Sequence, residues 1–335
     1  MGDVAMSIPV LRALIVQNPD VKITVLSRSF LKPMFENLPN VNFYTADVDG
    51  KHKGFFGLLQ LSKELKTLKI DAIADIHNVL RSKILRLFFS LSRNKIAVID
   101  KGRSEKKALT RKENKIFKQL KSTHERYADV FRGFGFQVNL SNPQFPEKEE
   151  LPNNINSLIG SGYKKLIGIA PFAQYESKMY PLNLMEKVIE NISENTNYKV
   201  LLFGGGKKEV EILQNLASKY KNTISLAGKV KLTDELMTIS HLGCMVSMDS
   251  ANAHLAAMQG VKTITIWGVT HPFTGFAPFN QPIENTITPD LEKYPKIPCS
   301  IYGNKICEGY ENIMQSISPK KVINKIEEVL KNIPD

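Results

Sequence analysis

Cysteine is scarce in this sequence. The three that occur, Cys244, Cys299 and Cys307, are irregularly spaced. Small domains that depend on disulfides carry a denser set, so the pattern excludes a disulfide framework and fits a reducing compartment. Cys299 and Cys307 share a Pro/Gly-rich loop, but a zinc site needs a second pair of ligands. We therefore expect no metal site and no cofactor.

Long apolar runs are absent as well. No run approaches the roughly 20 residues that a membrane-spanning helix needs, and the chain does not open with the charged and then apolar pattern of a secretory signal. The 335 residues are 42% hydrophobic, which is ordinary for a globular protein with two domains. We predict a cytoplasmic protein with two cores.

Acidic residues are fewer than basic ones, 33 against 45, and the excess lies in the first half. It is densest in residues 101–126, where ten basic residues accompany three acidic ones. This segment is either an ordinary solvated face or a landing site for a phosphorylated, membrane-anchored acceptor, because each Lys or Arg beside an anionic leaflet adds about 1 kcal/mol. A nucleic-acid-binding protein is a third and weaker interpretation, because no recognised nucleic-acid-binding motif accompanies the charges. The acceptor-binding candidates here are Lys106, Lys107, Arg111 and Lys112.

Strand and helix periodicities alternate along the chain, which predicts parallel sheets with helices on both faces. In the first half we expect helices at 8–17, 30–38 and 57–68 and strands at 21–27, 41–44 and 71–76. In the second half we expect strands at 165–170, 198–203, 223–226, 244–248 and 261–267, and helices at 182–194, 208–219, 233–240, 253–258 and 319–330. A proline-rich, charged linker at 141–154 separates the halves. The fold class is therefore α/β, with Rossmann-like domains at residues 1–145 and 146–335.

Ligands of such sheets bind at the carboxyl ends of the strands. His77 follows the strand at 71–76 and is either a substrate contact or a loop histidine with its own partners. Asp249 and Ser250 end a buried strand and open a helix, where free backbone N–H groups suit a phosphate; the alternative is a connecting loop with a capping aspartate. Four loops of the second half share this edge and can converge on one nucleotide. The donor-binding candidates in them are Gly204, Gly205, Glu209, Gly228, Lys229, Asp249, Ser250, Ala251 and His254.

Five motifs in this order resemble the family of lipopolysaccharide heptosyltransferases. They are Gly2-Asp3-Val4; Gly168-Ile169-Ala170-Pro171 with Lys178; Phe203-Gly204-Gly205 with Glu209; Leu226-Ala227-Gly228-Lys229; and D-S-x-x-x-H-L-A-A-x-x-G from Asp249, followed by W-G-x-T-x-P from Trp267. The chain departs from the family at Ala251 and Asn252, where Gly-Pro is more usual, and at Tyr180, which is often Trp. These departures bear on the sugar more than on the fold.

The resemblance implies a GT-B fold, in which the two domains face each other across a cleft and the last helix crosses back onto the first domain. It also implies an inverting, metal-independent transfer of heptose from ADP-heptose to a lipopolysaccharide core acceptor, with peripheral contact to the cytoplasmic face of the inner membrane. Lys178 is the candidate that stabilises the diphosphate leaving group, and Asp3 is the candidate base, unless it only caps the helix that follows. A sugar-nucleotide epimerase of the same architecture is the runner-up.

In the relatives a buried strand precedes the glycine-aspartate motif, whereas here the motif stands at residue 2. That strand would lie in the middle of a doubly wound sheet. We therefore expect that the first strand is missing from this chain and that the native start lies upstream.

Overall fold

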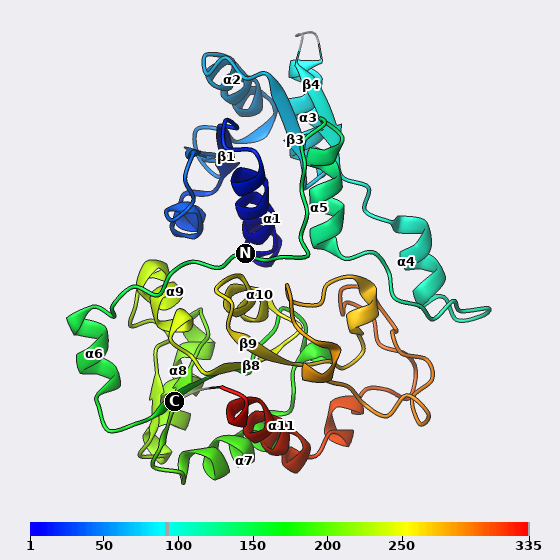
Figure 1. The fold of residues 1–335 in the computed structure, drawn as a ribbon. Helices are drawn as coiled ribbons and strands as arrows, with labels where there is room; N and C mark the ends of the chain where they lie inside the picture. Colours follow the sequence, from blue (N-terminus) through cyan, green and yellow to red (C-terminus); the bar gives the residue numbers. More distant parts are fainter. Residues whose placement is uncertain (91–93, 334–335) are drawn as a thin grey trace. The chain divides into compact units, whose positions relative to one another are not determined.

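The structure is a computed structural model that describes residues 1–90 and 94–333 (Figure 1). Apart from the first two residues, it divides into two compact units. Unit 1 comprises residues 3–101 and 123–144, and unit 2 comprises residues 102–122 and everything from residue 145 onward. Within the described residues, no helix is both long and apolar enough to cross a membrane.

Unit 2 is built on six parallel strands in the order β10-β9-β8-β5-β6-β7. They are β5 (Lys165–Ala170), β6 (Tyr198–Leu202), β7 (Thr223–Ser225), β8 (Cys244–Met248), β9 (Lys262–Ile266) and β10 (Thr286–Ile287). All five residues of β8 are buried, as expected for a parallel sheet covered on both faces. The order is that of a doubly wound nucleotide-binding sheet, and it reverses direction between the adjacent strands β5 and β8.

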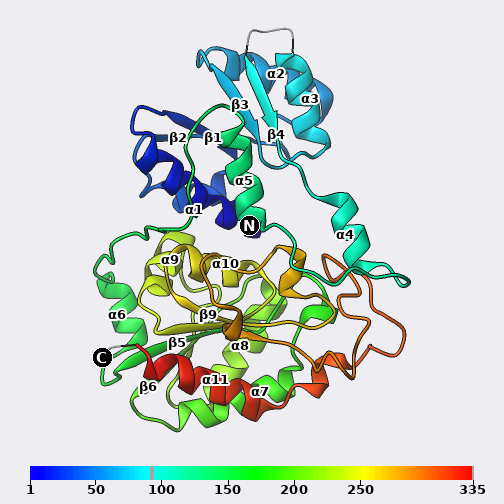
Figure 2. The same ribbon diagram turned by 45° about the vertical axis from the view of Figure 1, so that its right-hand side comes forward.

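Helices cover both faces of this sheet. They are α6 (Asn153–Ile159), α7 (Leu182–Ser193), α8 (Lys207–Lys219), α9 (Leu232–Ser240), α10 (Ala251–Met258) and α11 (Pro319–Lys331). Helices α7 and α11 lie side by side (Figures 1 and 2) and share one core with alternate strand residues such as Ile167 and Ile169. Helix α11 begins as predicted, with Ser318 accepting from the Lys321 backbone N–H and proline at its first turn. It packs within unit 2, and its crossing to the first domain stays a prediction.

Unit 1 contains two separate two-stranded parallel sheets in its described part, rather than the one continuous sheet that alternation predicts. The pairs are β1 (Ile23–Ser27) with β2 (Val41–Thr45), and β3 (Ala72–Asp75) with β4 (Lys95–Val98). Most of their residues are only half-buried, unlike those of unit 2. The helices are α1 (Gly2–Gln17), α2 (Gly54–Lys66), α3 (Leu80–Phe89) and α5 (Thr123–Arg132). The strand expected ahead of Gly2 stays a prediction.

Two local predictions for unit 1 are wrong. The helix expected at 30–38 is a 3-10 helix, η1 (Ser29–Phe35), with Pro33 inside it, where a proline lacks the N–H that an α-helix would need. The helix expected at 8–17 begins earlier, at Gly2, so the glycine-aspartate motif forms the first turn of α1. Helices α3 and α5 and strand β4 were not predicted.

Residues 102–122, including α4 (Arg103–Thr110), belong to unit 2 although the sequence on either side belongs to unit 1. The Leu120 N–H donates to the Phe273 carbonyl at 3.0 Å, and the Phe117 ring packs 5.1 Å from the Phe273 ring. The ammonium of Lys115 donates to the carbonyls of Lys296 and Pro298. The basic segment is therefore anchored to unit 2 by its apolar residues and one lysine.

Candidate functional site

A buried ion pair occupies the point where the unit 2 sheet reverses its order. Asp249 follows β8 directly, and Lys178 ends the short 3-10 helix η2 (Glu176–Lys178) in the loop after β5. Lys178 Nζ lies 2.9 Å from Asp249 Oδ2, and the two side chains are only 12% and 8% exposed. The Thr270 hydroxyl donates to the same oxygen at 3.0 Å. The Lys178 ammonium is thus held in place at the edge where such sheets bind ligands.

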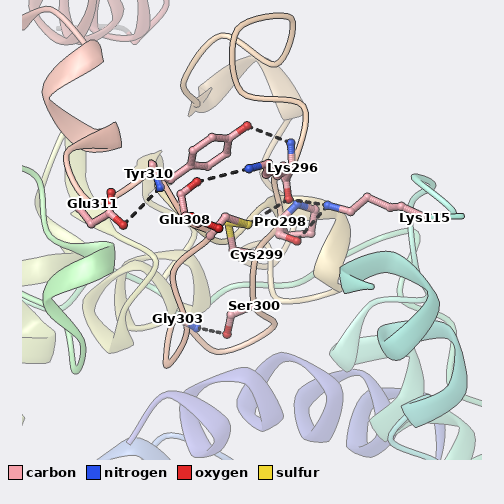
Figure 3. Close-up of a disulfide and its surroundings, with 11 residues drawn as sticks. Lys115, Lys296, Pro298, Cys299, Ser300, Gly303, Glu308, Tyr310 and Glu311 are labelled. Carbon is pink, nitrogen blue, oxygen red and sulfur yellow. Dashed lines mark hydrogen bonds between the residues drawn. A yellow bond between two sulfur atoms is a disulfide. The ribbon is translucent and has the colours of Figure 1, made fainter. Parts of the chain in front are cut away.

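The stem of Lys178 is held by a glycine from a distant loop. Gly303 has a φ of +86°, and a Cβ there would overlap the side-chain carbons of Lys178. The Ser177 hydroxyl donates to the Gly303 carbonyl. Ser300 Oγ accepts from the Gly303 N–H at 2.9 Å (Figure 3) and from the Tyr302 N–H at 3.2 Å. The turn at 300–303 therefore fixes the backbone against which Lys178 lies.

A disulfide between Cys299 and Cys307 closes this loop (Figure 3). The cysteine content was expected to fit a reducing compartment, but these two cysteines are joined, because the turn at Ser300 brings together two residues that are eight positions apart in the sequence. Just before Cys299, the ammonium of Lys115 holds the carbonyls of Lys296 and Pro298. Cys244 is buried in the core, as expected.

The start of α10 lies beside the ion pair in the sequence. Ser250 is its N-cap, and the hydroxyls of Ser247 and Ser250 are 3.0 Å apart. The first N–H groups of any helix, here from Ala251 onward, have no partner within the helix and are available to an anion. One turn later, burial and the charge of Lys178 lower the pKa of His254 to about 3. His254 is thus neutral near pH 7.

The other donor loops follow β6 and β7. Glu209 Oε2 accepts from the Gly205 N–H at 2.9 Å, so one carboxylate oxygen holds the glycine loop. A Cβ at Gly204 would collide with the Leu213 side chain. Gly228 has a φ of +72° in the loop that carries Lys229. Because β8, β5, β6 and β7 are neighbours in the parallel sheet, the four predicted loops leave the same edge.

Unit 1 brings Asp3 and His77 together. Their side chains are 60% and 62% exposed, with His77 Nε2 3.9 Å from Asp3 Oδ2. Asp3 is not the capping residue of α1, because the N-cap is Met1. Sequence reasoning missed Asp75, which accepts from the N–H groups of His77 and Asn78 at 3.1 and 2.6 Å. An aspartate at a strand end before His-Asn was the available signal.

The four basic acceptor candidates lie in two environments. Lys107, Arg111 and Lys112 are exposed. Lys106 is buried, and its ammonium lies 4.3 Å from the centroid of the Phe276 ring. Lys106 therefore contributes to packing within unit 2. Among the described residues, no three or more His, Cys, Asp or Glu side chains form a cluster suited to a metal ion.

Comparison with known proteins decides the family. The model for glycosyltransferase family 9 (heptosyltransferase) matches residues 58–303. The chain belongs to this family. It is 25% identical to lipooligosaccharide heptosyltransferase 2 of Campylobacter jejuni over 338 residues, which cover 99% of this chain and 96% of that protein.

Two solved structures share the fold of this glycosyltransferase. A family 9 glycosyl transferase from Veillonella parvula aligns with a TM-score of 0.76 at 20% identity, covering 99% of this chain and 95% of the other. The E. coli ADP-heptose lps heptosyltransferase II aligns with a TM-score of 0.69 at 18% identity, covering 98% and 96%. Both cover the two units, which fits the predicted GT-B fold class.

Proposed function

We propose that this family 9 glycosyltransferase moves heptose from ADP-heptose to a lipopolysaccharide core acceptor, with inversion and without a metal ion. The names of the Campylobacter relative and of the E. coli structure support the sugar, the donor and the acceptor class. The observation that carries the proposal is the buried pair of Lys178 and Asp249 at the switch point of a nucleotide-binding sheet.

In this mechanism Lys178 stabilises the negative charge that develops on the departing diphosphate, together with the N–H groups at the start of α10. Asp249 cannot itself favour an anion, because two negative charges repel. We therefore assign Asp249 and Thr270 the task of fixing Lys178 in place. Glu209 holds the glycine loop, so that backbone approaches the donor closely.

Asp3 accepts the proton from the acceptor hydroxyl as that oxygen attacks the anomeric carbon from the side opposite the leaving group. His77, 3.9 Å away, is placed to contact the same acceptor. Lys107, Arg111 and Lys112 offer exposed charge to the phosphates of the acceptor. Because that acceptor is anchored in a membrane, the enzyme works in peripheral contact with the cytoplasmic face of the inner membrane.

The test is a transfer reaction with purified enzyme, ADP-heptose and a heptose-deficient core oligosaccharide, followed by mass spectrometry. We expect a product heavier by one heptose, with undiminished yield in EDTA. Isomerised sugar nucleotide formed without acceptor would instead identify an epimerase. Salt-sensitive binding to DNA or RNA, with no transfer, would identify a nucleic-acid-binding protein.

A further inference from the structure

An exposed apolar face lies on unit 1, where helices α2 and α3 pack together (Figure 2). Four large side chains on these helices are more than half exposed: Phe55 (53%), Phe56 (82%), Leu80 (74%) and Leu87 (63%). The rings of Phe56 and Phe55 are 5.8 Å apart, and those of Phe55 and Phe88 are 5.4 Å apart, so aromatic contacts join the two helices. We call this surface the α2–α3 face. Contiguous apolar surface of this kind marks an interaction site, unlike isolated exposed residues.

Positive charge borders this face. On α3, Leu80 and Leu87 are seven residues apart and therefore on the same side of the helix, and the exposed Arg81 and Lys83 flank them. Helix α3 contains no acidic residue. Residues 51–90 hold eight Lys and Arg against three Asp and Glu, so the surroundings of the α2–α3 face are positively charged.

Two of those three acids are already paired. Asp75 forms an ion pair with Arg86 at 2.9 Å, and Glu64 forms one with Lys51 at 2.6 Å. They offer little attraction to a cationic partner. A partner that matches the α2–α3 face must therefore have an apolar interior and a negatively charged surface.

We propose that the α2–α3 face docks on an anionic lipid bilayer. Exposed Phe and Leu beside Lys and Arg are typical of helices that lie in the membrane interface, whereas lysines are depleted in protein–protein interfaces. This inference deepens the membrane contact of the proposed function, since it names the surface that makes it. That surface lies outside the basic segment 101–126, which the sequence suggested as a landing site for the membrane-anchored acceptor.

The α2–α3 face is already formed before it meets a bilayer. The opposite sides of its helices are fixed in a small core that includes Leu61 of α2 and Phe89 of α3. Docking therefore requires no helix to fold, and the helical content of the enzyme should not rise on binding. In this respect it differs from a disordered segment that folds on lipid.

The experiment measures co-sedimentation of the full chain with vesicles of phosphatidylcholine containing phosphatidylglycerol, with pure phosphatidylcholine vesicles alongside. The variants are Phe56→Ser, Leu87→Ser and Lys83→Glu. The matched control is Ile283→Ser, which changes an apolar residue that is 50% exposed in unit 2. Since these side chains are exposed, their replacement should leave the melting temperature unchanged.

We expect binding to the anionic vesicles only, weakened by added salt. Phe56→Ser and Leu87→Ser should each weaken it by about tenfold, as one buried apolar side chain would, and Ile283→Ser should not. Binding that is absent, or equally strong in all variants, overturns the proposal. So does a dimer in analytical ultracentrifugation that Phe56→Ser dissociates, since that assigns the face to a second copy.

The vesicles carry no sugar or acceptor, so this result is independent of the transfer reaction. Transfer to a water-soluble core oligosaccharide should be the same in Phe56→Ser and the unsubstituted enzyme. If neither transfers heptose while the vesicle results hold, the proposed function fails and the docking surface stands. If transfer occurs but the vesicles are not bound, only the docking surface is wrong.

Discussion

Lys178 and Asp249 are both largely buried, so replacing either alone leaves an unpaired charge that destabilises the fold by about 3–5 kcal/mol. An activity loss in a single variant therefore mixes chemistry with unfolding. The double variant Lys178→Met/Asp249→Asn removes both charges at once. We expect it to melt close to the unsubstituted enzyme.

The double variant should nevertheless remain catalytically impaired. Its kcat/KM is expected to fall by roughly 10²-fold or more, about 2.7 kcal/mol, because the charge that faces the diphosphate is gone. Thermal melts and steady-state kinetics on the same preparation check both parts. A stable double variant with ordinary turnover would show that Lys178 has no catalytic role.

His271 makes stability depend on pH. Its ring accepts from the Phe273 N–H, and burial with the nearby charge of Lys115 lowers its pKa from 6.5 to about 4. Between these two values the unfolded chain binds a proton that the folded chain does not. The free energy of unfolding should therefore fall as pH drops from 6.5 to 4, by up to about 3 kcal/mol from this residue.

His271→Asn tests this effect, because asparagine can also accept the Phe273 N–H but does not titrate. Denaturant melts at pH 7 and pH 4.5 should show a smaller stability difference in the variant than in the unsubstituted enzyme. An unchanged difference would assign the acid sensitivity to other groups.

The sequence identified most of the residues of the candidate site, but it did not show which of them contact each other. Lys178 and Asp249 are 71 positions apart, and their contact depends on β5 and β8 being neighbours in the sheet, which no local pattern reveals. The disulfide likewise required the turn at Ser300. Asp75 was missed because its role is to accept N–H groups of its own turn, which leaves no periodic signal.

At the scale of elements, we predict that the loop closed by Cys299 and Cys307 positions Lys178. Gly303→Ala would place a methyl group against the lysine stem, whereas the matched control Gly309→Ala would meet nothing within 4 Å. Both glycines have positive φ, +86° and +82°, so both alanines cost about 1–2 kcal/mol of stability. Only Gly303→Ala should also reduce kcat/KM, by about tenfold through displacement of Lys178.

Thermal melts and steady-state kinetics of both glycine variants distinguish backbone strain, which both should show, from displacement of Lys178, which only Gly303→Ala should cause. Equal kcat/KM values would mean that the loop does not position the lysine. Serine substitution of both cysteines extends the test, because an unclosed loop should reduce kcat more than it changes donor KM.

The strands of unit 2 were predictable because buried parallel strands read as short apolar runs between turn residues. Helix α3 was not, because its apolar residues point in more than one direction. Leu80 and Leu87 face solvent while Phe89 is buried, so no single stripe marks the helix. The separate sheets of unit 1 depend on pairings that alternation alone does not specify.

At the scale of the whole molecule, the proposed roles divide between the units. Asp3 belongs to unit 1, and the donor loops belong to unit 2. Asp3→Asn should therefore lower turnover by roughly 10²-fold to 10⁴-fold, while the affinity for ADP, measured by calorimetry, stays the same. Weaker ADP binding would indicate that Asp3 contributes to the donor site instead.

Residues 102–122 are synthesised long before the part of unit 2 on which they pack. Lys115 precedes its partner Lys296 by 181 residues, so the ribosome must add roughly that many residues before the anchor exists. At about 5–20 residues per second this takes roughly 10–40 s. Until then a segment rich in lysine and arginine lies near the polyanionic RNA of the ribosome without its full set of partners in unit 2. Lys296 and Pro298 are therefore the last of the described anchoring partners of this segment to be synthesised.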